Sequence, residues 1–172
     1  MSEEDKRRIA RTLREDKERE LMDIFEIETV PMSEEYIGGV ASLERECFSH
    51  PWSEASLREE LDNSQAHFLC AAADGRVVGY IGVQEIAGEA YITNVAVSEE
   101  FRRRKIAERL LDEAERGARE RGCAFITLEV RASNAPAKAL YIKHGFEQVG
   151  TRKNFYSDPR EDAEIMTKFF DR

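Results

Sequence analysis

The 172-residue sequence has no run of 18 consecutive apolar residues, which is the length that a membrane-spanning helix requires. Its first residues are charged, whereas a secretory signal peptide places an apolar segment soon after its start. We therefore expect a cytoplasmic protein with no membrane partner.

Cysteine is scarce, and Cys47, Cys70 and Cys123 are far apart and odd in number. This spacing matches neither a metal-binding motif nor a disulfide framework, so we interpret the three as small buried residues. The three histidines also lack the spacing of metal ligands. The sequence therefore predicts no metal site.

Two glycine-rich phosphate-binding motifs are absent. No G-x-G-x-x-G follows a predicted strand, and no G-x-x-x-x-G-K-S/T occurs anywhere, so neither a dinucleotide-binding fold nor a P-loop is supported. The net charge of −9 and the isoelectric point near 5.0 argue against a general nucleic-acid-binding protein, since such proteins are usually basic. We expect no nucleic-acid partner.

Charged residues make up 35% of the chain and apolar residues 41%, which is typical of a globular protein with a highly charged surface. Residues 1–24 are almost all charged, with alternating signs. They predict an N-terminal extension that is either an exposed helix stabilised by i,i+4 pairs or disordered, and that could serve as an oligomer contact. The folded domain is predicted for residues 25–172, and its oligomeric state is not determined by the sequence.

Apolar periodicity predicts the order β-α-α-β-β-β-α-β-α-β-β after residue 24. This order describes a mixed sheet covered by helices, in the α/β or α+β class. An Asp74-Gly75 turn joins two of the strands as a hairpin. The strands are expected at 24–30, 67–73, 76–86, 90–97, 124–130, 147–155 and 163–169, and the helices at 33–47, 53–61, 106–121 and 134–144.

The most informative stretch is FRRRKIAERLL, residues 101–111, which joins a buried-looking strand to an amphipathic helix. Four consecutive cations, residues 102–105, lie where that helix begins. A helix N-terminus offers unpaired N–H groups and the positive end of the helix dipole. A solvated basic corner would have the same composition, but the flanking strand and helix favour a site for a polyanion such as a pyrophosphate.

Residues 24–170 resemble the GNAT acetyltransferases, in the order of their elements and in several motifs. Within that family the chain is most similar to the branch that acetylates the N-terminal alanine of a small-subunit ribosomal protein. The resemblance implies a GNAT fold with about seven strands and about four helices, acetyl-CoA as cosubstrate, and a protein N-terminus as acceptor. The motifs are ITNVAV (92–97), FRRRKIAERLL (101–111), LEVRASNAPAKALYIKHGF (128–146), NFY (154–156) and REDAEIM (160–166).

The resemblance also implies the residues that bind acetyl-CoA. The strand backbone at Val95, Ala96 and Val97 would bind the pantetheine arm, and Asn134 would contact the cosubstrate. The family's pyrophosphate loop, Q/R-x-x-G-x-G/A, falls on Arg102, Arg103, Arg104, Lys105, Ile106 and Ala107.

Lys105 departs from the family because it stands where glycine is usual. Glycine permits a close backbone approach to phosphates and a positive φ, so the affinity for the cosubstrate is the property that this substitution affects. The lysine N–H can still donate, and its ammonium group adds a positive charge.

The resemblance gives catalytic roles to two residues. Glu129 matches a general base, and Tyr141 matches the general acid that protonates the leaving thiolate. Without the family, an isolated strand glutamate or helix tyrosine is more often structural. Direct transfer needs an uncharged amine, a polarised thioester carbonyl and a proton for the thiolate, and it needs no enzyme nucleophile. A strand N–H at a bulge near Val95 would polarise the carbonyl.

The candidate substrate-binding residues are Trp52, Asn94 and Tyr156. Tyr156 matches an aromatic residue of the family's substrate-binding loop, in which Phe155 replaces a second tyrosine. A tryptophan such as Trp52 is more often part of the core than of a substrate pocket.

The acceptor class follows from amine chemistry. An α-amine has a pKa of about 8 and a lysine about 10.4, so at pH 7 the free base is about 250-fold more abundant for the α-amine. One carboxylate acting through water could then suffice. Two alternatives stay open: a GNAT enzyme that acts on lysine, a polyamine or a small-molecule amine, and a non-catalytic acyl-CoA-binding module.

Overall fold

The computed structural model describes residues 1–171, except for the side chains of residues 18–25. The strands are β1 (Ile27–Pro31), β2 (Leu69–Ala73), β3 (Arg76–Ile86), β4 (Glu89–Val97), β5 (Phe125–Arg131), β6 (Glu147–Ser157) and β7 (Arg160–Phe169). The helices are α1 (Glu3–Phe25), α2 (Glu34–Cys47), α3 (Glu54–Leu61), α4 (Ile106–Glu120), α5 (Ala135–Lys143) and the 3-10 turn η1 (Glu99–Phe101).

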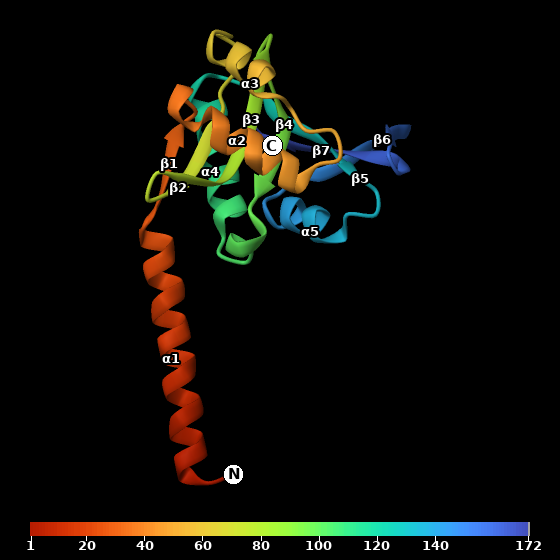
Figure 1. Ribbon diagram of the computed structural model, residues 1–172. Helices are drawn as coiled ribbons and strands as arrows, with labels where there is room; N and C mark the ends of the chain where they lie inside the picture. Colours follow the sequence, from red (N-terminus) through yellow and green to blue (C-terminus); the bar gives the residue numbers. More distant parts are fainter. Residues whose placement is uncertain (172) are drawn as a thin grey trace.

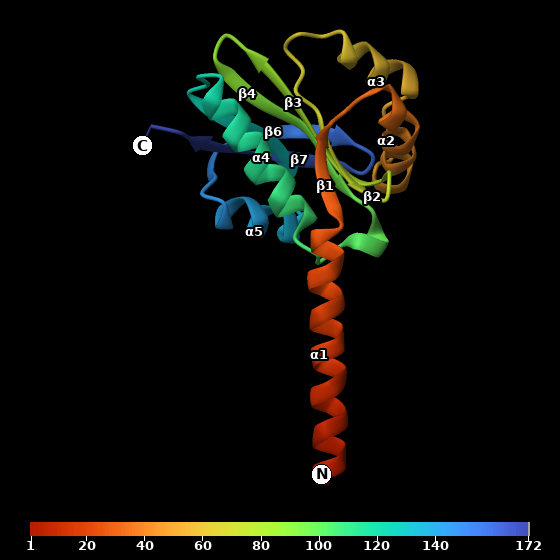
Figure 2. The same cartoon turned by 90° about the vertical axis from the view of Figure 1, so that its left-hand side faces the viewer.

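All seven strands form one mixed sheet in the order β1-β2-β3-β4-β5-β7-β6 (Figure 1). The helices α2 and α3 lie on one side of the strands, and α4 lies on the other (Figure 2). This architecture confirms the predicted fold class and the predicted order of elements.

Local signals in the sequence explain where several helices begin and end. The side chains of Ser53 and Asn134 each accept a hydrogen bond from the backbone N–H three residues later, which caps α3 and α5. Gly122 and Gly145 follow α4 and α5 with positive φ values of 85° and 86°, as C′ glycines do. Ser33 precedes α2, but its side chain forms no capping hydrogen bond.

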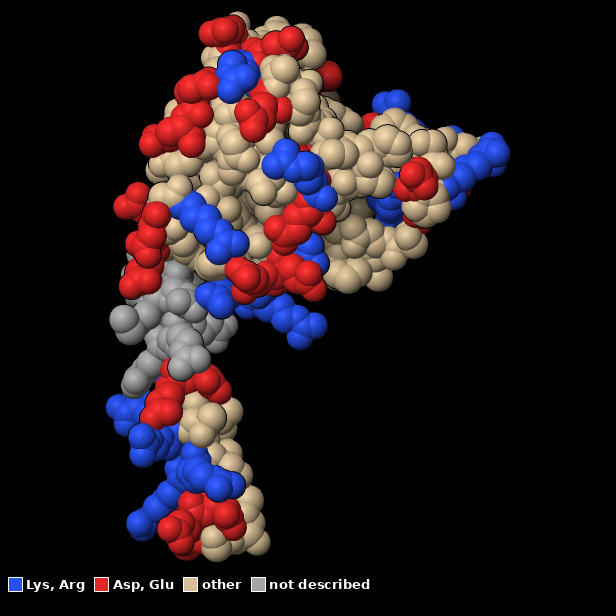
Figure 3. Space-filling model, in the orientation of Figure 1, with Lys and Arg blue, Asp and Glu red and all other residues tan. Residues whose placement is uncertain are grey.

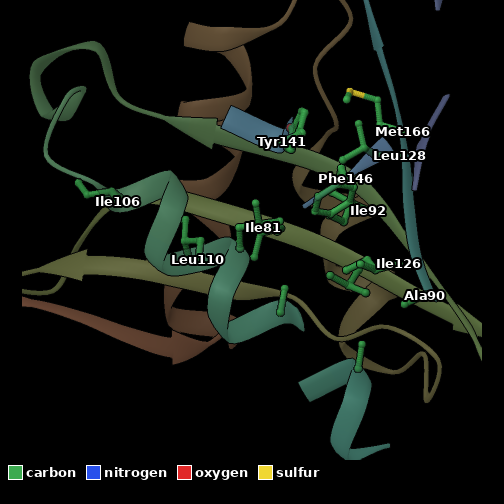
Figure 4. Packing of buried hydrophobic residues seen from close by; sticks show 14 of the residues in the cluster. Ile81, Ala90, Ile92, Ile106, Leu110, Ile126, Leu128, Tyr141, Phe146 and Met166 are labelled. Carbon is green, nitrogen blue, oxygen red and sulfur yellow. The ribbon is translucent and has the colours of Figure 1, made fainter. Parts of the chain in front are cut away.

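The core is built where helix α4 crosses the sheet. The apolar stripe of α4 is buried, and its Leu110 lies close to Ile81 of β3 (Figure 4). Tyr141 of α5 belongs to the same cluster, and its ring centroid lies 5.6 Å from that of Phe146. A second cluster lies under α2 and α3, so each face of the sheet has its own apolar layer.

Strands β4 and β5 pair only over a short length, and this opens the sheet. They are parallel, with three pairs that run from Glu89 with Phe125 to Tyr91 with Thr127. Among the described residues, β4 has no strand partner on this edge after Tyr91. On its other edge β4 continues antiparallel to β3, with one extra residue, Thr93, at a bulge. The bulge therefore lies two residues before Val95, close to the position that the family resemblance implied.

The β6–β7 hairpin is longer than the sequence indicated. The expected loop over residues 156–162 is wrong, because β6 continues to Ser157 and β7 starts at Arg160. The pair Tyr156–Glu161 belongs to the ladder, so only residues 158 and 159 form the turn. The extra strand residues are mostly charged or polar. They were not predicted as strand because an exposed hairpin does not need apolar alternation. The end of the hairpin is rich in basic side chains (Figure 3).

Helix α1 projects away from the body of the protein (Figures 1 and 2). The ion pairs of Lys6 with Glu3 and of Arg11 with Glu15 are local, within one turn of this helix. The apolar side chains of Ile9 and Leu13 are exposed. None of the helices in the described part of the chain has the length and apolarity needed to cross a membrane.

Candidate active site

A cleft of about 610 Å³ opens where β4 and β5 separate. Its other walls come from the α2–α3 loop, the start of α5 and the β6–β7 turn. The structure brings together here six of the residues that the sequence analysis selected: Asn94, Val95, Glu129, Asn134, Tyr141 and Tyr156.

The carboxylate of Glu129 is buried, and each of its oxygens has a partner: one is in an ion pair and the other accepts a hydrogen bond. Arg152 Nε of β6 lies 3.1 Å from Oε1, and the Tyr91 hydroxyl of β4 donates to Oε2. The side chain of Glu129 is 6% exposed and that of Arg152 is 57% exposed. A carboxylate has about four lone-pair sites, so Glu129 keeps acceptor capacity for a water or an amine.

Tyr91 and Tyr141 are both held in the protonated form by their surroundings. Burial raises the pKa of Tyr141 to about 12. Burial, followed by the hydrogen bond to Glu129, raises the pKa of Tyr91. A tyrosine that stays protonated can donate a proton to a leaving thiolate, which is the chemistry expected of Tyr141.

Arg131 joins Tyr156 to the β6–β7 turn at one wall of the cleft. Its guanidinium lies over the Tyr156 ring, 4.2 Å from the centroid, and donates to the carbonyl oxygens of Asp158 and Pro159. Burial raises the pKa of Tyr156, and the Arg131 charge opposes that rise. Tyr156 and the β6–β7 turn are therefore held as one unit beside Glu129.

The basic loop lies beside the cleft, at the N-terminus of α4. A second pocket of about 160 Å³ is lined by six of the predicted cofactor-binding residues. Arg104 lies outside it, in a separate pocket of about 110 Å³. The six residues are Val97, Arg102, Arg103, Lys105, Ile106 and Ala107.

Lys105 adopts the backbone conformation that glycine would favour. Its φ is 60° and its ψ is 21°, in the left-handed region, and helix α4 starts at the next residue. The first N–H groups of a helix have no intrahelical acceptor, so they are available to an anion. The unpaired edge of β4 leads directly to this pocket. The chain thus fits a ligand with an extended arm and a pyrophosphate.

Two predicted residues, Ala96 and Trp52, line none of these three pockets. The side chain of Ala96 is buried in the α2-side cluster, while its backbone pairs with Tyr80 of β3. Trp52 packs on Phe68, with 5.9 Å between the ring centroids, and does not line the cleft.

Sequence reasoning missed several residues of the site. Arg131 carried a signal, because it lies two residues after Glu129 and so faces the same side of the strand. Tyr91 and Arg152 carried none, since only strand pairing brings them to Glu129.

Cys47 also lines the cleft, and burial raises the pKa of its thiol, which disfavours the nucleophilic thiolate. Among the described residues, no three His, Cys, Asp or Glu side chains come together as a metal site would require.

Comparison with known proteins gives the family of this fold and site. The model of the acetyltransferase (GNAT) family matches residues 37–146. A Bacillus subtilis (strain 168) protein provisionally named ribosomal protein bS18-alanine N-acetyltransferase is 40% identical over 133 residues, which cover 77% of this chain and 88% of that protein. The ribosomal protein bS18-alanine N-acetyltransferase of Escherichia coli (strain K12) is 36% identical over 130 residues, covering 72% of this chain and 84% of that protein.

Solved structures agree with the sequence relatives. The crystal structure of the ribosomal-protein-S18-alanine N-acetyltransferase from Escherichia coli superposes with a TM-score of 0.76 at 29% identity, covering 82% of this chain and 92% of that one. Ard1 from Thermoplasma volcanium superposes with a TM-score of 0.79 at 26% identity, covering 86% and 99% of the two chains. This chain therefore belongs to the GNAT family of acetyltransferases, which transfer the acetyl group of acetyl-CoA to an amine.

Proposed function

We propose that this protein is a cytoplasmic N-α-acetyltransferase of the RimI type, whose acceptor is the N-terminal alanine of a bS18-like ribosomal protein. The names of the relatives at 36–40% identity support this acceptor. The observation that carries the chemistry is the shared cleft, which Glu129 and Tyr141 line from β5 and α5.

The proposed transfer is direct, within a ternary complex. The acceptor nitrogen attacks the thioester carbonyl as its proton passes to Glu129 through water, and the C–S bond then breaks as Tyr141 protonates the thiolate sulfur. An N–H of the β4 segment at Asn94 and Val95 would stabilise the carbonyl oxygen. The pantetheine arm would lie along the free edge of β4, including Ala96 and Val97, with Asn134 at its side.

The pockets also suggest which residues bind the pyrophosphate and which contact the acceptor. The N-terminus of α4 and the cations of residues 102–105 would bind the pyrophosphate, together with Ile106 and Ala107. Tyr156 and Asn94 would contact the acceptor. Trp52 would support the α2–α3 loop from behind, through its packing on Phe68.

Mass spectrometry of a peptide panel tests this function. The panel contains Ala-, Ser-, Met- and Gly-started peptides, blocked peptides with an internal lysine, and spermidine. Acetylation at a free N-terminus, strongest for the Ala-started peptide, is the expected result. Label on lysine or spermidine would overturn the acceptor class, and an absence of acetyl-CoA binding in calorimetry would overturn the enzyme itself.

A further inference from the structure

Glu44 of α2 is a carboxylate that the proposed chemistry does not use. Its side chain is completely buried, and among the described residues it pairs with no lysine, arginine or histidine. An ionised carboxylate without a cation is costly to bury unless hydrogen bonds replace its hydration. One of those hydrogen bonds comes from Asn94, which lines the cleft, so Glu44 can orient a group of the cleft wall.

Three donors from three different segments converge on Glu44. The backbone N–H of Trp52 donates to Oε2 at 3.0 Å, and Asn94 Nδ2 donates to Oε1 at 2.9 Å. The Tyr80 hydroxyl also donates to Oε1. Of these three donors only Asn94 lines the cleft.

The carboxylate determines which way the Asn94 amide points. A carboxylate accepts hydrogen bonds and cannot donate them, so Asn94 must direct its NH2 group toward Glu44. The other end of the amide, Oδ1, accepts no hydrogen bond from the described residues. Asn94 lies directly after the β4 bulge, while Glu129 lines the same cleft from β5.

We propose that Asn94 Oδ1 accepts a hydrogen bond from the acceptor amine, and that Glu44 is the positioning residue that keeps this oxygen turned toward the amine. The inference rests on the proposed function and adds the group that orients the nucleophile. A hydrogen bond from one N–H of the amine fixes the nitrogen while its lone pair is aimed at the thioester carbonyl.

Replacement of Glu44 by glutamine gives a sharp test, because one donor cannot move. The Trp52 N–H is a backbone donor, so it requires the glutamine oxygen at the Oε2 position. The glutamine NH2 then occupies the Oε1 position and faces Asn94, whose amide must turn over to accept from it. Tyr80 can accept from the same NH2 group, although its own O–H then loses the acceptor that Glu44 provided. The cleft now meets the NH2 group of Asn94.

The experiment is calorimetric binding of an Ala-started peptide to the CoA-saturated protein, with an N-terminally blocked peptide as reference. For Glu44→Gln and for Asn94→Ala we expect the dissociation constant of the free-amine peptide to rise about tenfold, and that of the blocked peptide to stay the same. The double variant should bind no more weakly than Asn94→Ala alone, since Glu44 acts through Asn94.

The matched control is Glu115→Gln, the same substitution at another buried glutamate, one that pairs with Lys168 and does not line the cleft. It should lower the melting temperature without changing peptide affinity. Additive losses in the double variant, or unchanged affinity in Asn94→Ala, would overturn the inference. Turnover of the same samples with acetyl-CoA is measured separately, so loss of the proposed function would appear as absent product despite amine-selective binding.

Discussion

Arg152 lies 3.1 Å from Glu129, measured from Nε to Oε1, although the two residues belong to β6 and β5 and are not paired directly in the sheet. The carboxylate is buried, and the guanidinium is largely in solvent. The candidate base thus combines an ion pair to a largely exposed guanidinium with a hydrogen bond from the Tyr91 hydroxyl.

Glu129→Gln should lower turnover of an Ala-started peptide by about 100-fold at pH 7, because the amine loses its proton acceptor. The loss should shrink above pH 8, since the α-amine, with a pKa of about 8, is then uncharged without help. Thiol release measured from pH 6 to 10 checks this. A pH–rate profile identical to that of the parent protein would assign the base to another residue.

Tyr141→Phe should slow the chemical step by about 100-fold with little change in CoA affinity. The phenylalanine keeps the ring contact with Phe146 and removes only the hydroxyl. Because the pKa of Tyr141 is raised to about 12, its proton is present below that pH and is lost only as the pH rises through it. No loss of rate from Tyr141 should therefore appear below about pH 11. Single-turnover kinetics and calorimetry separate the two quantities, and a loss of CoA binding would make Tyr141 a contact of the cosubstrate.

Lys105→Gly should raise the melting temperature by about 2–4 °C, because it removes about 1 kcal/mol of left-handed backbone strain at φ 60°. Lys105→Ala is the matched control, since it removes the same charge and keeps the strain. Both variants should weaken CoA binding at low salt through loss of the ammonium group. Equal melting temperatures for the two variants would contradict the assignment of strain to this residue.

Gly82→Ala should destabilise the protein by about 1–3 kcal/mol. A Cβ at residue 82 would lie 2.4 Å from Thr93 Oγ1 at the bulge and 2.8 Å from the Phe68 ring. Gly38→Ala serves as the control within α2, where the added Cβ meets only one atom, at 3.9 Å. There the substitution should stabilise the helix by about 0.5–1 kcal/mol. Urea denaturation measures both, and changes of the same sign would contradict the prediction.

Removal of residues 1–24 should leave the melting temperature and the turnover of the remaining chain nearly unchanged. The ion pairs Lys6–Glu3 and Arg11–Glu15 are local and exposed, and surface ion pairs of this kind contribute about 0.3–0.5 kcal/mol each to their own helix. Differential scanning fluorimetry and a peptide assay check the two quantities. Fewer copies of the chain per particle in light scattering after the removal would assign α1 to an interface between copies of the chain.

The sequence predicted the elements well where local physics decides them. The helix α4 followed from its apolar stripe and from Gly122, and the cap at Asn134 followed from the residue type alone. The β6–β7 hairpin was misjudged, because its ladder at Tyr156 and Glu161 is stabilised by pairing across an exposed turn and has no apolar alternation.

The sequence also allowed candidate site residues to be selected from the family motifs. Two of them, Glu129 and Tyr141, line one cleft in the structure. The environment of each residue was not visible. Whether a strand glutamate is solvated or buried depends on the side chains that neighbouring strands place against it. For Glu129 these are Tyr91 and Arg152, which are 38 and 23 positions away in the chain.

The amino-acid sequence by itself determined the order of elements, the charged N-terminal segment and the basic turn, because propensity, capping and apolar periodicity act between near neighbours. The tertiary structure alone decided where β4 separates from β5 and how Glu44 meets Asn94. These features depend on strand pairing and on contacts across about 50 residues, and no local pattern encodes them.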